Sequence, residues 1–330
     1  GKSRLNYPLI DGVVNGCPSL LLEPQRTNLV PYSQTFTGWT LTNAVETPNA
    51  LISPDGALNA SKFVTSNSGV DIKYQNIPVT ANTVYTYSFY CYYVGGLGLQ
   101  GRFYDTTNGA NIEYYDYMEQ IEQGKWKRVT RTFTTPVGCT NIQVWYLASS
   151  ATFPVTAYYW GAQLEEGSYP TSYIPNYGTS AGITRVAETA NGAGDASTFN
   201  SSEGVLMAEI SALANDGTNR VITLNDGSTS NRVQVYFNTS NQINVGVSPG
   251  GSGQPDISYT VDIKSFLKVA FKYKTNDFAL WVNGIKVGEN LTGIVPTGLN
   301  ALNFDNVGGT LPFYGNTKQI QYFDSALNDS

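Results

Sequence analysis

The stretch "TVYTYSFYCYYV", residues 83–94, sets the fold class of this 330-residue chain. Its more apolar side chains fall on every second residue, namely Tyr85, Tyr87, Phe89, Cys91 and Tyr93. Successive side chains of a strand point to opposite faces, so this period of two predicts a strand with one face buried. The opposite face carries Tyr90 and Tyr92, where threonine or a charged residue is more usual. The stretch therefore predicts a β-strand with aromatic side chains on both faces.

Segments of the same character follow this strand, separated by turns that contain Gly, Asn or Pro. They are "GRFYDTT" (101–107), "IEYYDYM" (112–118), "WKRVTRTFTT" (126–135), "NIQVWYLAS" (141–149) and "AYYWGAQLEE" (157–166). None of the chain shows a sustained 3.6-residue apolar period, which argues against long helices. An antiparallel sandwich of the jelly-roll type is therefore predicted.

A second series of strands begins at "GVLMAEISAL" (204–213), after a connector of small residues, Gly and Pro. Within this series, Asn283-Gly284 in "FKYKTNDFALWVNGIKV" (271–287) is a strong signal for a type I′ hairpin turn. We therefore predict an all-β chain of two antiparallel β-sandwiches in series. The expected ranges are an extended N-terminal segment at 1–34, a first jelly roll at 35–172, a linker at 173–200 and a second sandwich at 201–330.

The N-terminal segment contains "NGCPSLLLEPQRTNLVPYS" (15–33), with three prolines around the apolar run Leu20, Leu21 and Leu22. Proline interrupts helices and central strands, so this segment is not predicted to fold alone. Its leucines expose apolar surface that an extended chain by itself leaves in water. Two arrangements are open: a clasp on the sandwich that follows, or burial against neighbouring copies around a three-fold axis.

The composition excludes several functions. The chain has no histidine, which excludes Ser-His-Asp and Cys-His nucleophilic systems and His-ligated zinc. A net charge of −6 without a basic run argues against nucleic acid as a partner. No apolar run reaches the roughly 18 residues of a membrane-spanning helix, so membrane insertion is not predicted.

The three cysteines, Cys17, Cys91 and Cys139, lack CxxC spacing. A disulfide between Cys91 and Cys139 is one alternative, and buried free thiols are the favoured one.

Several blocks of the sequence resemble known families. "RLNYPLIDGVVNGCPSLLLEPQRTNLVPYS" (4–33) resembles a segment that introduces receptor-facing or fibre domains in tailed-bacteriophage structural proteins. "YYWGAQLEEGSYPTSYIPNYGTSAGITRVAE" (158–188) is similar to the closing strand and linker of the same proteins. "TNLVPYSQTFTGWT" (27–40) and "GKWKRVTRTFTTP" (124–136) resemble strands of a carbohydrate-binding-module jelly roll. "IQYFDSALNDS" (320–330) resembles the last strand of a concanavalin A-like (laminin-G-like) domain.

This resemblance implies a non-enzymatic virion protein, a head or tail fibre at the virion surface. It would attach to bacterial surface polysaccharide as a homotrimer, together with other virion proteins. Two other functions stay open, because fold-level likeness does not determine function. One is the glycan-binding region of a larger carbohydrate-degrading enzyme, and the other is a purely structural capsid decoration.

A glycan-binding face needs aromatic rings for the C–H side of a sugar and a few fixed polar groups for its hydroxyls. Six residues out of phase with the apolar strand positions are predicted to share such a face: Tyr90, Tyr92, Arg102, Tyr104, Tyr115 and Tyr117. The alternative is that they fill the opposite sheet face or a subunit contact. Trp145 is a further candidate, because "IQVWYLA" does not indicate its buried face. The resemblance assigns three other tryptophans to packing, namely Trp39, Trp126 and Trp160.

Some acidic residues are candidates for Ca²⁺ binding, and others for catalysis. Domains of both resembling types often hold Ca²⁺ through Asp or Asn, but Gly161 stands where the carbohydrate-binding modules place an Asp. Asp226 and Asp277 are candidate Ca²⁺ ligands in the second sandwich, and both lie in ordinary turn sequences. The segment 104–123 gathers five acids, of which a glycosidase would need two at a set separation: Asp105, Glu113, Asp116, Glu119 and Glu122. Solvated loop acids explain the same pattern, and we predict no enzymatic activity.

Overall fold

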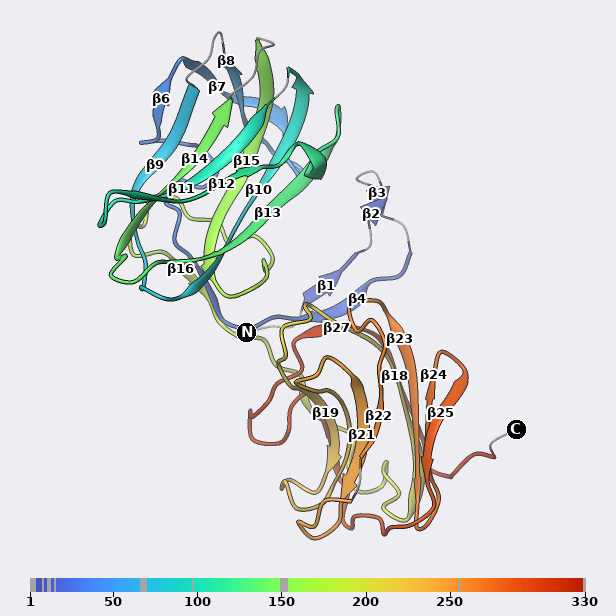
Figure 1. The fold of residues 1–330 in the computed structure, drawn as a ribbon. Helices are drawn as coiled ribbons and strands as arrows, with labels where there is room; N and C mark the ends of the chain where they lie inside the picture. The colour runs from blue at the N-terminus through green and yellow to red at the C-terminus, as the bar shows by residue number, and fades with distance from the viewer. Residues whose placement is uncertain are drawn as a thin grey trace. The chain divides into compact units, whose positions relative to one another are not determined.

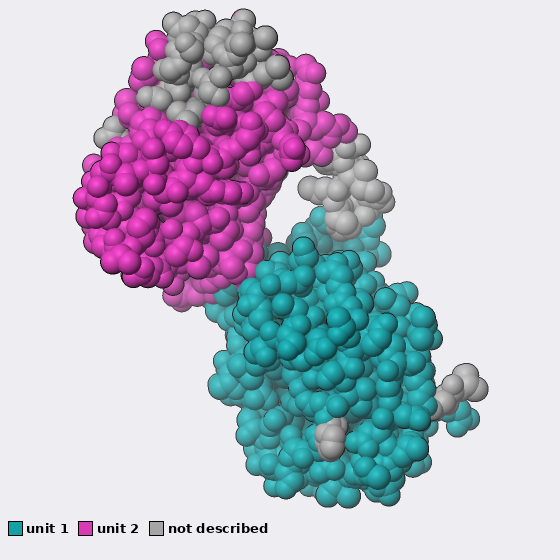
Figure 2. Space-filling model, viewed as in Figure 1, with its two compact units in different colours: residues 1–10, 14–24, 187–330 teal, residues 11–13, 25–186 magenta. Residues whose placement is uncertain are grey.

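The chain forms two compact units (Figures 1 and 2), one of residues 11–13 and 25–186 and the other of residues 1–10, 14–24 and 187–330. A computed structural model describes residues 4–7, 9–10, 13–14, 16–65, 70–96, 98–148, 154–254 and 256–328. We call residues 25–186 the first sandwich, and residues 1–10, 14–24 and 187–330 the second sandwich. The prediction of an all-β fold with antiparallel sandwiches is confirmed. In chain order, the first sandwich is inserted into the second.

Two five-stranded sheets make up the first sandwich. In spatial order, one sheet contains β13 (Trp126–Thr134), β10 (Val84–Gly95), β15 (Val155–Glu166), β8 (Leu58–Thr65) and β7 (Ala44–Ile52). The other contains β12 (Ala110–Asp116), β11 (Leu99–Asp105), β14 (Asn141–Ala148), β9 (Val70–Pro78) and β6 (Thr40–Thr42). A separate pair consists of β5 (Arg26–Asn28) and β16 (Ile183–Arg185), and a 3-10 turn, η1 (Met118–Gln120), follows β12.

Strand β10 has the predicted alternation. Its apolar set lies in the core between the two sheets, with Tyr85, Tyr87, Phe89 and Cys91 buried and Tyr93 partly buried. The other side of β10 is covered at its start, because Thr86 donates to the Gly167 carbonyl at 2.7 Å. Arg128 likewise bridges Ser88 and the Thr171 carbonyl. The segment after β15 therefore covers part of the outer face, which the alternation alone does not reveal.

Buried phenols in this core bind one another. The Tyr87 hydroxyl donates to that of Tyr146 at 2.7 Å, and the hydroxyls of Tyr117 and Tyr159 are 2.8 Å apart. The Tyr146 and Tyr159 rings stack with their centroids 4.5 Å apart. Burial raises the pKa of all four phenols well above its usual value, so they remain protonated. A core rich in tyrosine is stable here because each of these hydroxyls has a partner.

The second sandwich has one seven-stranded and one six-stranded sheet. The larger contains β1 (Arg4–Asn6), β4 (Ser19–Leu22), β27 (Gly315–Phe323), β18 (Glu203–Ala212), β23 (Leu267–Lys274), β24 (Phe278–Val282) and β25 (Ile285–Asn290). The smaller contains β17 (Asn191–Ala193), β26 (Ala301–Asn303), β19 (Arg220–Asn225), β20 (Arg232–Phe237), β21 (Ile243–Ser248) and β22 (Ile257–Tyr259). A short ribbon pairs β2 (Leu9–Ile10) with β3 (Val13–Val14). The predicted β24–β25 hairpin is confirmed, with φ of 51° at Asn283 and 83° at Gly284 as a type I′ turn requires.

The N-terminal leucines belong to the second sandwich. Strand β4 pairs with β1 on one side and with β27 on the other, with Leu20 opposite Thr317. Leu22 is 1% exposed and lies in the core of the second sandwich. The clasp expected on the following sandwich therefore lies on the second one, because the edge of β27 offers unpaired backbone groups to the proline-flanked strand. Assembly around a three-fold axis stays a prediction.

An ion cluster lies where the chain leaves the second sandwich and returns to it. Arg4 forms ion pairs with both Glu23 and Glu188, whose side chains are almost fully buried. The two carboxylates are adjacent, since the Glu23 N–H donates to Glu188 at 2.9 Å and the Glu188 N–H donates to the Glu23 carbonyl at 3.1 Å. Arg4 thus neutralises two buried acids that would otherwise repel each other.

The three cysteines are free thiols, as favoured from the sequence. Cys91 and Cys139 are buried, whereas Cys17 is exposed. Over the described part of the chain, no helix combines the length and the apolar character of a membrane span.

Candidate functional site

A row of cationic and aromatic side chains crosses one outer face of the first sandwich. Lys73 of β9 is opposite Trp145 of β14, which in turn is opposite Arg102 of β11. Arg102 is opposite Tyr114 of β12. On each of these four strands a residue next to the row lies in the core, namely Ile72, Tyr146, Phe103 and Tyr115, so the four side chains of the row lie on the outer face of the sheet. We call Lys73, Trp145, Arg102 and Tyr114 the cation–aromatic row.

Trp145 lies between two cations. The Lys73 Nζ is 4.1 Å from the indole ring centroid, and the guanidinium carbon of Arg102 is 4.4 Å from it. Both distances are within the range of cation–π attraction. The indole is only 9% exposed, and its Nε1 donates to the Gln143 Oε1 at 2.9 Å. Trp145 is therefore a fixed support for the two cations and not an open shelf.

Arg102 is surrounded by rings. Its guanidinium carbon is 4.6 Å from the Tyr104 centroid and 5.1 Å from the Tyr114 centroid, in addition to its contact with Trp145. Its Nε donates to the Asn111 Oδ1 at 2.6 Å, and its two Nη atoms have no hydrogen bond or ion pair with the described residues. Aromatic rings attract the faces of a guanidinium and leave the N–H donors in its plane available to a ligand.

Three of the residues predicted from the sequence meet at this row: Arg102, Tyr104 and Trp145. Tyr114, which is 53% exposed, was not predicted from the sequence, because a register shift between Phe103 and Tyr104 changes the phase of β12. Lys73 was not predicted either, because strand β9 is absent from the predicted strands. The alternation of Lys73 with its apolar neighbours in "VDIKYQNIP" (70–78) was the available signal.

Tyr115 and Tyr117 lie in the core, which corrects the prediction that they share a binding face. Tyr115 is 5% exposed, and its ring stacks on Phe103 with the centroids 5.1 Å apart. Gly101 makes room for it, because a Cβ at that position would come within 2.1 Å of the Tyr115 ring. Tyr117 is fully buried. The register shift in β12 turns both rings inward.

Tyr90 and Tyr92 lie on the other sheet, away from the row. The Tyr90 ring is 5.4 Å from Trp160, and the Tyr92 ring is 5.7 Å from Trp126 and 5.8 Å from Tyr158. Both tyrosines are half-buried in these clusters. The six nominated residues are therefore divided among two outer faces and the core. Of the tryptophans assigned to packing, two are buried and one is half-buried: Trp39, Trp160 and Trp126 respectively.

The acids of segment 104–123 have structural partners or face solvent singly. Burial raises the pKa of Asp105, but hydrogen bonds from Asn108, Cys139 and Thr107 outweigh it and hold that pKa below its usual value. Three of the other acids also have partners: Glu113 pairs with Arg131, Asp116 accepts a hydrogen bond from the Met118 N–H, and Glu122 pairs with Lys125 and Lys127. Glu119 is exposed to solvent. These partners are typical of turns and sheet edges.

The two candidate calcium ligands are also engaged with protein groups. Asp226 accepts hydrogen bonds from Ser228 and Asn231, which outweigh burial and keep its pKa below the usual value. Asp277 forms an ion pair with Lys272 at 2.7 Å. Among the described residues, no group of three or more acids or cysteines converges as a metal site would require. Calcium binding at either residue stays a prediction.

Comparison with known proteins gives distant structural likenesses. No protein-family model and no curated protein matches the chain. A similar solved structure is the CBM40 of an IT-sialidase from Ruminococcus gnavus, which has also been solved bound to α2,3-sialyllactose. It is 14% identical to this chain with a TM-score of 0.35, and the likeness covers 42% of this chain and 90% of that one. Another is a toad ovary galectin in complex with thio-digalactose, with 13% identity, a TM-score of 0.29 and coverage of 40% and 98%. At these identities and TM-scores, the likenesses carry no functional argument.

Proposed function

We propose that the first sandwich binds glycans without catalysis, through the cation–aromatic row, and that it prefers chains bearing carboxylates. The observation that supports this is Arg102, whose faces pack on three rings while both Nη groups have no hydrogen-bond or ion-pair partner among the described residues. A guanidinium held in this way is preorganised for a bidentate contact with a carboxylate, and such charge-assisted hydrogen bonds are the stronger kind.

The exposed ring of Tyr114 supplies the apolar part of such a site. A sugar presents C–H groups on one side, and these pack on an aromatic face, while its acidic group reaches the neighbouring Arg102. A charged hydrogen bond contributes about 1.5–3 kcal/mol and an exposed ring contact about 1 kcal/mol. A single row therefore binds weakly, and several copies on one particle would multiply the affinity by about 10²–10⁴.

We also propose the finer assignment, a surface fibre of a tailed-phage virion that acts as a homotrimer on bacterial polysaccharide. Its support is the resemblance of residues 4–33 and 158–188 to phage structural proteins. The second candidate is the binding region of a carbohydrate-degrading enzyme, and a structural capsid decoration is the third. Gene order distinguishes them, because capsid and tail genes beside this gene would exclude the enzyme, and a catalytic domain in the same reading frame would exclude the fibre.

Binding to polygalacturonate, with dextran as the neutral contrast, tests the proposed site. We expect Arg102→Gln to weaken binding to polygalacturonate about tenfold, and to abolish most of its decrease between about 0.05 and 0.5 M salt. Tyr114→Ala should weaken binding about threefold to tenfold on the same polymer.

Matched controls are available on exposed surface. Tyr177, which is 70% exposed in the same sandwich, serves as Tyr177→Ala, and the exposed Lys264 of the second sandwich serves as Lys264→Gln. Both should bind as the wild type does. Wild-type affinity of both row variants for polygalacturonate, or equal binding of dextran and polygalacturonate at low salt, would exclude the proposed site.

A further inference from the structure

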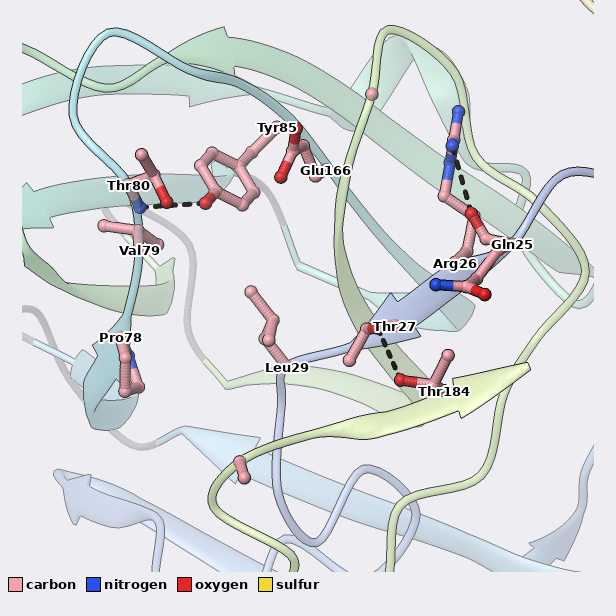
Figure 3. Close-up of a pocket in the computed structure, with 12 residues that line it drawn as sticks. Gln25, Arg26, Thr27, Leu29, Pro78, Val79, Thr80, Tyr85, Glu166 and Thr184 are labelled. Carbon is pink, nitrogen blue, oxygen red and sulfur yellow. Dashed lines mark hydrogen bonds between the residues drawn. The ribbon is translucent and has the colours of Figure 1, made fainter. Parts of the chain in front are cut away.

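A groove of about 680 Å³ opens on the first sandwich, and it shares no residue with the cation–aromatic row. One wall is the β5–β16 pair, and the opposite wall is the loop after β9 with the start of β10 (Figure 3). The volume lies within the range of small-ligand sites. Residues far apart in sequence, at 25–29, 78–85, 166–167 and 181–184, build it together.

Part of the groove lining is apolar. Leu29 projects into its middle, with Val79 and Pro78 on the facing wall (Figure 3). The surrounding polar groups are fixed by bonds among themselves, since the Thr80 N–H donates to the Tyr85 hydroxyl at 2.9 Å and the hydroxyls of Thr27 and Thr184 are 2.7 Å apart. An apolar patch bordered by fixed hydroxyls suits a ligand that is itself amphipathic, with C–H groups on one side and hydroxyls at its edge.

The cation of the groove is already engaged. The Arg26 Nε is 3.7 Å from the buried Glu165 Oε2, its guanidinium lies 5.3 Å from the Tyr169 ring centroid, and its Nη1 donates to the Gln25 carbonyl at 3.2 Å. Its remaining edge lies against Gly167, where an added Cβ would come within 2.6 Å of Nη2. Arg26 therefore holds the groove walls together and has little capacity left for an anion.

The acid of the groove is not engaged. Glu166 is opposite Tyr85 in the register of β15 and β10, and it is exposed. Its carboxylate has no hydrogen bond or ion pair with the described residues. A carboxylate in this state accepts two hydrogen bonds from adjacent hydroxyls of a ligand. It also disfavours an anionic ligand, in contrast to the row, where the uncommitted charge is positive.

We infer that this groove is a second glycan site, which takes a neutral, hydroxyl-rich sugar ring. Leu29 and Val79 contact the C–H side of the ring, and Glu166 accepts hydrogen bonds from two of its hydroxyls. The site is independent of the row, and it disfavours the acidic sugars that the row prefers. A glycan that contains both neutral and acidic sugars would therefore engage the sandwich at two separate places.

Saturation-transfer difference NMR on the full chain tests this, with glucose, galactose, mannose and N-acetylglucosamine as neutral probes and glucuronate as an anionic one. We expect at least one neutral sugar to bind. Glu166→Gln should weaken that sugar about fivefold or more, because the amide keeps one acceptor and loses the charge. Thr80→Trp, which fills the groove from an exposed position and keeps the backbone N–H, should abolish its binding.

The matched control is Glu119→Gln, an exposed acid of the same sandwich outside the groove, which should leave sugar binding unchanged. Arg102→Gln should also leave it unchanged, so a failure of the groove and a failure of the row are distinguishable. The inference is overturned if no neutral probe binds, if binding survives both Glu166→Gln and Thr80→Trp, or if glucuronate binds the Arg102→Gln variant more tightly than the neutral sugars do.

Discussion

The two sandwiches have the same kind of architecture but are filled with different side chains. The core of the first contains many rings, including Phe36, Phe63, Tyr87, Phe89, Phe103, Tyr146 and Tyr159. The core of the second is mainly aliphatic, including Leu206, Ile210, Ile222, Leu224, Val233, Val235, Val245 and Val269. Aromatic filling brings hydroxyl groups inside, so the first core depends on paired phenols, whereas the second depends mostly on the packing of branched side chains.

This difference shows that a high tyrosine content is not by itself a sign of binding. The sequence predicts Tyr115 and Tyr117 on a binding face, but both side chains lie in the core of the first sandwich. The residue that distinguishes the outer face is Arg102, which three aromatic rings surround. Aromatic residues in the first sandwich thus fill the core and, on one outer face, hold a cation.

The largest expected effect concerns strand β4 of the second sandwich, which contains Leu22. Leu22→Ala removes a side chain that is 1% exposed and should lower the free energy of unfolding of the second sandwich by about 3 kcal/mol. Hydrogen exchange followed by mass spectrometry measures this, since amides of β18, β23 and β27 should lose protection. Amides of β10 and β15 in the first sandwich should keep theirs.

The control for this variant is Leu5→Ala on the adjacent strand β1, where the side chain is 58% exposed. It should change the free energy of unfolding by less than about 0.5 kcal/mol. If Leu22→Ala caused an equal loss of protection in both sandwiches, β4 would not stabilise the second sandwich alone. The contrast between two separately stabilised cores would then be wrong.

Local features were predictable from the sequence, and long-range ones were not. The alternation in residues 83–94 and the Asn283-Gly284 turn depend on neighbouring residues, and both predictions are confirmed. The pairing of β4 with β27 joins residues 20–22 to residues 315–317, and no local pattern encodes it. The face on which Tyr114 lies depends on a register shift against β11. Only two of the four residues of the row, Arg102 and Trp145, were therefore predicted from the sequence.

A smaller effect is expected from the phenol pairs of the first core. Tyr146→Phe leaves the Tyr87 hydroxyl buried without its acceptor, which should cost about 1–2 kcal/mol of unfolding free energy. The double variant Tyr87→Phe with Tyr146→Phe removes both polar groups and should cost less than the sum of the two single variants. Denaturant unfolding of the four proteins measures this coupling.

The matched control is Tyr259→Phe in the second sandwich, where the side chain is 38% exposed and water replaces any lost contact. It should change the unfolding free energy by less than about 0.5 kcal/mol. Strict additivity of Tyr87→Phe and Tyr146→Phe would show that the phenols of the first core do not depend on one another, and the contrast between the two cores would lose its physical basis.

The smallest effect is chemical and leaves stability unchanged. Burial, with the neighbouring Asp105, raises the pKa of the Cys139 thiol to about 11, and burial raises that of Cys91 as well. Both thiols should therefore stay protonated and unreactive toward iodoacetamide at about pH 8.5, whereas the exposed Cys17 should react. Mass spectrometry should find one label on the native chain and three in denaturant.

This labelling also separates the two sandwiches, because Cys91 and Cys139 lie in the first and the second has no thiol in its core. In Leu22→Ala, the second sandwich loosens, yet the label count should stay at one, since the two buried thiols become reactive only when the first sandwich opens. A count of three on the native variant would show that the sandwiches unfold as one cooperative unit. A count of one, together with faster exchange in β18 and β27, would show that each core stabilises its own sandwich.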